Sequence, residues 1–281
     1  MFANPYLHRQ RPVAFLLLAA AISAGAAHAQ GGLGLGLGPM RVDLNLAPGA
    51  VYSGVFALAN NGTEVTRIVG ETLDFYLDDT ATPQFGPNYQ REAEFSCRTW
   101  LAANPMEFEL NAGGQMAIRY TVRVPQTATS RSYHCAVGFT TQPAAGDGKA
   151  PMGLRTAVQI VGAIYVVVGK PALQGTIKDL RLEYSTDPKG PGWHALVILT
   201  NSGLMHFRPE GQLDVLDESG AVVETVQFIP APVLPERDQD FVLPLKLAKG
   251  EGKYRLRARL DLGGNEIQEA TANVVAKIPK P

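Results

Sequence analysis

The chain has 281 residues, with 25 Lys and Arg against 26 Asp and Glu, so its formal net charge at pH 7 is −1. This near neutrality lacks the positive charge that favours binding to nucleic acid or to an anionic lipid surface. The 20 prolines and 29 glycines are spread along the chain, and no window of a dozen residues keeps a 3.6-residue period, which argues against a helical fold.

Residues 1–29 have the layout of a secretory signal peptide. A positive region containing Arg9 and Arg11 precedes an apolar stretch over residues 13–27, and Ala27-His28-Ala29 matches a small-residue cleavage site. The apolar stretch is shorter than the ~20 residues that cross a bilayer as a helix. We therefore expect cleavage after Ala29 and export of a mature chain of 252 residues, with net charge −3 and no integral membrane segment.

Short alternating segments separated by turn residues predict β-strands in the first half of the mature chain. We expect these strands at 41–46, 51–58, 65–77, 116–124 and 133–140. Pro48-Gly49 and Asn60-Asn61-Gly62 supply turn signals between the first three strands. The polar stretch 78–94 contains two prolines and is expected to form a loop.

Cys97 and Cys135 are the two cysteines of the chain, and both lie in this first half. An even pair in an exported protein favours a disulfide. Closing a loop of ~39 residues would stabilise the fold by about 4 kcal/mol, because the unfolded chain loses entropy. Two buried free thiols are the alternative, and non-reducing mass spectrometry would reveal them.

Residues 158–168 form an apolar run that ends before Gly169-Lys170-Pro171. The run is too short to span a membrane, and its β-branched residues favour a strand. One face of that strand would carry Val158, Ile160, Ile164, Val166 and Val168. The other face would carry Val161, Ala163, Tyr165 and Val167. Since both faces are apolar, either the strand is central in its own fold or one face binds a partner.

After Pro171 the strand pattern begins again. We expect strands at 175–184, 194–200, 211–216, 222–228, 240–247, 254–261 and 266–275. Short strands at intervals of ~8–12 residues are typical of β-sandwiches. The sequence therefore predicts an all-β protein with two tandem immunoglobulin-like sandwiches: an N-terminal domain over residues 30–169 and a C-terminal domain over residues 170–281.

We expect no catalytic, metal or cofactor site. The mature chain has three histidines, none at metal-ligand spacing with another: His134, His194 and His206. No helix is expected after the glycine-rich stretch Gly31–Gly38, so it is not interpreted as a phosphate-binding loop. Three carboxylates lack the spacing of a calcium loop and are interpreted as a solvated strand end: Asp74, Asp78 and Asp79.

Three stretches are similar to the periplasmic pilus-assembly chaperone (PapD-like) superfamily. The first is the strand and turn from Pro39 to Gly49, and the second is Asn104 to Gln115, which resembles a proline-glycine motif of that family. The third is the order of strands from Tyr120 to Pro171. The resemblance implies a periplasmic location and a pilin-like subunit as partner, with an outer-membrane usher as a further partner.

The resemblance also implies which residues bind the subunit. The last strand of the first domain would pair with the subunit by β-strand addition. The side chains that contact the subunit would be Val158, Ile160, Ile164, Val166 and Val168. Arg41 falls where the family places an arginine that anchors the subunit's terminal carboxylate. The lysine that accompanies this arginine in the family is missing, since no Lys or Arg lies between Arg155 and Lys170. The alternative is an exported structural or adhesive protein whose apolar strand is internal.

Overall fold

The computed structural model describes residues 34–87, 89–142, 157–188, 190–229, 231–247, 250–264 and 266–278. The predicted signal peptide and its cleavage site lie outside these residues. The described parts of the chain fold into β-strands and two short 3-10 helices, η1 (Gln90–Phe95) and η2 (Arg98–Trp100). Within them, no helix has the length and apolar character needed to cross a membrane.

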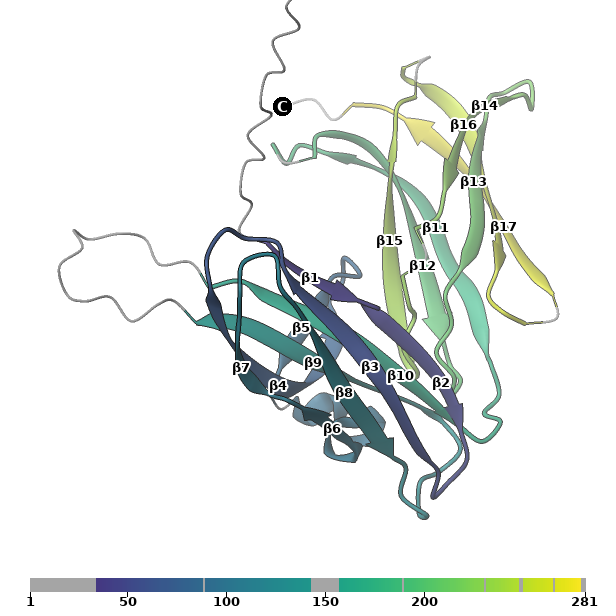
Figure 1. Ribbon diagram of the computed structural model, residues 1–281. Helices are drawn as coiled ribbons and strands as arrows, with labels where there is room; N and C mark the ends of the chain where they lie inside the picture. The colour runs from purple at the N-terminus through teal and green to yellow at the C-terminus, as the bar shows by residue number, and fades with distance from the viewer. Residues whose placement is uncertain are drawn as a thin grey trace, which may run out of the picture. The chain divides into compact units, whose positions relative to one another are not determined.

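Two sheets form the first half of the protein (Figure 1). One sheet has the order β1-β3-β8-β6, with β1 (Leu35–Gly38), β3 (Val51–Asn60), β8 (Gln115–Arg123) and β6 (Leu101–Asn104). The other has the order β2-β10-β9-β4-β5, with β2 (Arg41–Leu46), β10 (Gln159–Val168), β9 (Ser132–Gln142), β4 (Thr66–Leu77) and β5 (Pro83–Gly86). A further strand, β7 (Glu107–Leu110), pairs with β4.

The alternation of inward-facing and outward-facing side chains along the strands produces the apolar core between these two sheets. Along the second half of β3 and most of β8, every second side chain is buried, as in Phe56, Leu58, Ile118 and Val122, while their neighbours face outward. The predicted strands of this half are present. Four four-residue strands were not in the predicted set, namely β1, β5, β6 and β7. Each is shorter than the window in which alternation can be recognised. The expectation that residues 78–94 form a loop is corrected, because this stretch contains β5 and η1.

The second half contains two further sheets, and no described strand pairs between the halves. One has the order β11-β12-β15, with β11 (Gly175–Ser185), β12 (Gly192–Asn201) and β15 (Arg237–Leu245). The other has the order β14-β13-β16-β17, with β14 (Val222–Gln227), β13 (Glu210–Leu216), β16 (Gly252–Asp261) and β17 (Ile267–Ala276). All seven predicted strands are present, and the all-β prediction of two immunoglobulin-like sandwiches is confirmed.

Two hydrogen-bond motifs occur once in each half. Asn60 and Asn201 are both buried, and each accepts the N–H two residues ahead and donates to the carbonyl four residues ahead. Tyr133 and Tyr254 each bond through the hydroxyl to the backbone four residues earlier. The second motif is the tyrosine corner of immunoglobulin-like sandwiches. Both motifs indicate that the two halves share one local architecture.

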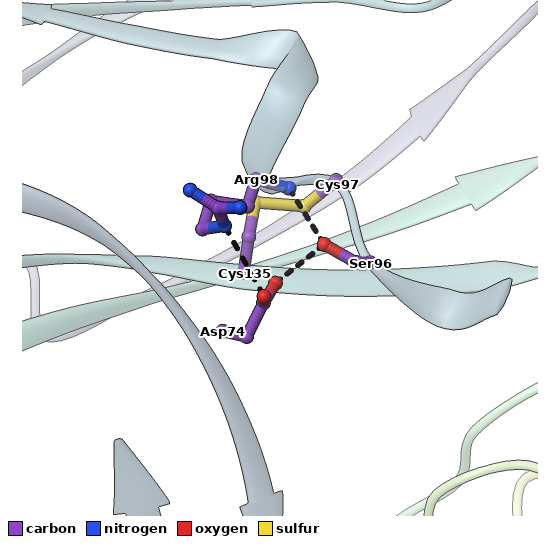
Figure 2. The surroundings of a disulfide bond; sticks show 5 residues. All are labelled: Asp74, Ser96, Cys97, Arg98 and Cys135. Carbon is purple, nitrogen blue, oxygen red and sulfur yellow. Dashed lines mark hydrogen bonds and ion pairs between the residues drawn. A yellow bond between two sulfur atoms is a disulfide. The ribbon is translucent and has the colours of Figure 1, made fainter. Parts of the chain in front are cut away.

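A disulfide joins Cys97 to Cys135 on β9, with a Cα–Cα distance of 5.2 Å, so the predicted bond is confirmed. Figure 2 shows Asp74 beside this disulfide, accepting hydrogen bonds from Ser96 and from Arg98 Nε, the latter at 3.1 Å. Only 5% of the Asp74 side chain is exposed. The interpretation of Asp74 as a solvated strand end is therefore wrong: its charge is balanced by an ion pair inside the fold.

Candidate functional site

The apolar strand predicted over 158–168 is β10, and its C-terminal part lies in the protein's own core. Ile164, Val166 and Val168 are 0% exposed and pack between the two sheets of the first half. The expectation that these three side chains face a guest is therefore corrected. They are buried because β2 pairs alongside this part of β10 and the sandwich closes over both strands.

The opposite face of β10 is covered as well. Tyr165 and Val167 are 5% and 8% exposed. Tyr165 packs in a second apolar cluster with Phe75 from β4 and Leu234 from the second half, and Val161 and Ala163 lie partly buried beside it. The C-terminal part of β10 is thus internal on both faces, which accounts for its almost unbroken apolar sequence.

The two edges of β10 are paired over different lengths. The antiparallel ladder with β9 runs from Gln159 to Val167, whereas the parallel ladder with β2 runs only from Ala163 to Val168. Among the residues that the structure describes, residues 159–162 therefore have a strand on one edge and none on the other. We call residues 159–162 the open edge of β10.

Hydrogen bonds show which backbone groups face this open edge. Val158 accepts a bond from β9 at 2.9 Å, whereas the N–H of Ala163 points the other way and donates to Met40 at 2.9 Å. Backbone groups of successive residues alternate between the two edges of a strand. The N–H and C=O groups of Gln159 and Val161 therefore face the open edge.

Apart from the exposed Gln159, the side chains near the open edge are apolar and only partly buried. Val158 and Ile160 are both partly buried, and Ile160, like Leu35 and Leu37 of β1, packs against the core of the first half. A Cβ at Gly162 would lie 2.7 Å from the Phe56 ring, so only glycine fits there. The glycine-rich stretch contributes β1, which pairs with β3 and does not close the open edge.

Arg41, the predicted carboxylate anchor, lies on β2 with half of its side chain exposed. Its Nε is 2.9 Å from Asp43 Oδ2. Arg208, from the second half, brings Nη1 to 3.4 Å from Asp43 Oδ1. Contact with His206 lowers the pKa of Asp43, and Arg208 and Arg41 lower it further against the opposing effect of burial. Two guanidinium groups thus converge on one ionised carboxylate.

Arg208 is a site residue that the sequence did not indicate. It lies 165 residues from Asp43 along the chain, and its guanidinium stacks over the Tyr165 ring at 4.4 Å. No local pattern around residue 208 distinguishes it from an ordinary surface arginine. No group of three or more potential metal ligands occurs within the described ranges.

No family model matches this sequence, and no curated protein matches it. Structure comparison gives the class 5 fimbriae chaperone CfaA, with 15% identity, a TM-score of 0.44, 88% of this chain covered and 100% of that chain covered. A chain in the CsuC–CsuE chaperone–tip subunit complex of Acinetobacter baumannii has 10% identity, a TM-score of 0.43, and coverage of 86% and 98%.

A chain in the Salmonella enterica complex of the SafA pilin with the SafB chaperone has 16% identity and a TM-score of 0.42. The match covers 85% of this chain and 97% of that chain. Over most of its length, the chain is similar to solved structures of fimbrial and pilus chaperones.

Proposed function

We propose that this protein is a periplasmic chaperone-like protein that binds a fimbrial or pilus subunit by β-strand addition to the open edge of β10. The observation that carries the proposal is the unequal pairing of β10, whose ladder with β2 begins at Ala163 while its ladder with β9 begins at Gln159. An unpaired strand edge is a template for another chain. The predicted signal peptide supports export.

Backbone groups and apolar side chains of β10 would make different contributions to subunit binding. The N–H and C=O groups of Gln159 and Val161 would pair with the guest strand and supply affinity, while apolar side chains fix its register. Val158 and Ile160 would be the main apolar contacts, each contributing up to about 1.5–3 kcal/mol on full burial. Since both are already partly buried, the actual gain is smaller than this upper value.

Arg41 and Arg208 together would supply a carboxylate anchor in place of the missing lysine. Both already contact Asp43, so an incoming carboxylate would compete with Asp43 for these two cations. Lys170 is exposed and offers another position for the anchor, whereas Arg155 lies outside the described residues. An outer-membrane usher would be a further partner in this proposal.

Site-specific photocrosslinking in intact cells tests the proposal. A photoreactive residue at position 160 should capture a fimbrial or pilus subunit that mass spectrometry identifies. The matched control is position 275 on β17, where Val275 is 65% exposed but lies on another strand. Equal capture from both positions would contradict the proposal. Capture from neither would favour the alternative of an exported structural or adhesive protein.

A pair of substitutions at Val161 separates backbone pairing from side-chain contact. Val161→Pro removes an N–H that faces the open edge, and proline is tolerated on the edge of a sheet. Val161→Ala shortens the side chain but keeps the N–H. We expect Val161→Pro to abolish co-purification of the subunit and Val161→Ala to retain most of it. Equal losses in two folded variants would refute pairing at this edge.

A further inference from the structure

A short segment of the second half, residues 204–208, contacts three strands of the first half. The N–H of Ser132 on β9 donates to the Leu204 carbonyl at 2.7 Å. The N–H of His206 donates to the hydroxyl oxygen of Ser132 at 3.0 Å. Arg208 bridges Asp43 on β2 and Tyr165 on β10, two residues that are register partners in the β2–β10 ladder. We call residues 204–208 the junction segment.

The His206 ring is held in a setting that suits its neutral form. Its Nδ1 lies 3.0 Å from the Ser132 hydroxyl oxygen, and the ring packs on Tyr165 with 4.9 Å between centroids. Since this oxygen already accepts the backbone N–H of His206, its own proton can be donated to an unprotonated Nδ1. The remaining ring proton then sits on Nε2, which is 3.8 Å from Asp43 Oδ1.

The charges around His206 disfavour a positive ring. β2 contributes Asp43 and Arg41, the junction segment contributes Arg208, and β9 contributes His134. Tyr165 on β10 stays neutral, because burial raises its pKa to about 12. The Asp43 carboxylate therefore already pairs with two arginines, and a protonated His206 would add a third cation beside it. The side chain of His206 is also only 8% exposed, so water would solvate its charge poorly.

We propose that His206 is an acid-sensitive latch, whose protonation loosens the junction segment from β2, β9 and β10. The proposal concerns the junction alone and does not depend on subunit binding. Burial, followed by Arg208 and His134, lowers the pKa of His206 below its ordinary value, against the raising effect of Asp43. A lowered folded-state pKa means that the contribution is present above the ordinary histidine pKa and is lost as pH falls through it toward the folded value.

Hydrogen exchange on the mature chain tests the latch directly. Protection of the Ser132 and His206 amides, corrected for the intrinsic exchange rate, should fall by about tenfold or more between about pH 7.5 and about pH 5, because the closed junction segment disfavours protonation of His206. The Leu256 amide, whose residue is 0% exposed in the second core, should keep its protection. Unchanged protection at Ser132 and His206 would overturn the proposal.

Two variants separate titration of His206 from a merely structural role. His206→Gln keeps a neutral polar side chain and should make junction protection independent of pH over the same range. Arg208→Gln removes a neighbouring positive charge and should raise the midpoint of the pH dependence. If either variant folds poorly, an NMR titration of the three mature-chain histidines in the wild-type protein shows which of them titrates together with the opening of the junction segment. Opening that follows His134 or His194 instead of His206 would overturn the latch.

Discussion

β10 and β17 are the last strands of the two halves, and they differ in how well their edges suit pairing with an added strand. Each pairs in antiparallel fashion with the strand before it in its sheet, β9 for β10 and β16 for β17. β10 is also paired by β2 over residues 163–168, whereas β17 has no second partner among the described strands. By pairing alone, β17 is the more open of the two.

The polarity of the side chains makes β10, and not β17, the better candidate for pairing with an added strand. The outward positions in the middle of β17 are Glu269, Thr271 and Asn273, which keep that edge soluble without a partner. Beside the open edge of β10, Val158, Ile160 and Val161 are apolar, and the exposed Gln159 is the polar side chain among them. An unpaired edge is therefore a poor indicator of binding by itself. An unpaired edge flanked by apolar side chains is a better indicator of binding, and β10 has such an edge over only part of its length.

Ile164→Asp should show the largest difference between the two strands. Ile164 is 0% exposed in the first core, so the substitution buries a carboxylate and should destabilise that half by more than about 4 kcal/mol. Val275→Asp on β17 should change stability by less than about 0.5 kcal/mol, because that side chain is 65% exposed. Urea unfolding followed by circular dichroism measures both. A stable, folded Ile164→Asp variant would contradict the burial of this face.

Removal of the disulfide should weaken one half only. The bond closes a loop with a sequence separation of 38, so the Cys97→Ala, Cys135→Ala double variant should lose about 4 kcal/mol of stability in the first half. Trp100 and Trp193 lie one in each half, so single-tryptophan variants report on each half by fluorescence. The Trp193 transition should stay in place. A shift of both transitions would show that the two halves unfold as one unit.

The strands of this protein could be predicted from sequence because their signals are local. Alternation and turn residues such as Asn201-Ser202-Gly203 mark every strand of the second half. The even cysteine count likewise sufficed for the disulfide. Asn60 and Asn201 have the same role in the two halves, since both side chains make the same turn-closing bonds.

The site could be predicted only in part, because it depends on contacts between distant residues. With both faces of β10 apolar, the sequence did not determine which face belongs to the domain's own core. The structure decides this through the pairing of β10 with β2, which lies about 120 residues earlier in the chain. Arg208 and His206 were missed for the same reason, since their partners are on strands of the other half.

Substitution of the two buried asparagines compares the halves at a motif that they share. The Asn60 amide donates to the carbonyls of Glu64, Leu110 and Asn111 at 2.8, 3.0 and 3.2 Å. The Asn201 amide donates to two carbonyls, at 2.8 and 3.2 Å. Leaving more carbonyls unpaired costs more, so we expect about 2–3 kcal/mol for Asn60→Ala and about 1–2 kcal/mol for Asn201→Ala. The same tryptophan probes measure both, and an inverted order would contradict this reasoning.

The two tyrosine corners should show the smallest difference. The Tyr133 hydroxyl accepts the Thr129 N–H at 3.1 Å and lies 3.2 Å from the Thr129 carbonyl. The Tyr254 hydroxyl donates to the Gly250 carbonyl at 2.8 Å. Tyr133→Phe leaves an N–H and a carbonyl without this partner, so it should cost about 1–1.5 kcal/mol, against about 0.5–1 kcal/mol for Tyr254→Phe.

Each tyrosine variant keeps its ring, so the measured loss reports the hydroxyl and not the packing of the aromatic group. Tyr133 is the second residue of β9, which carries Cys135 two residues later, so the disulfide holds this corner in place when the hydroxyl is removed. Tyr133→Phe should therefore cost more in the Cys97→Ala, Cys135→Ala background than in the wild type. A double-mutant cycle measures this coupling, and strict additivity of the two free energies would show that the corner and the disulfide stabilise β9 independently.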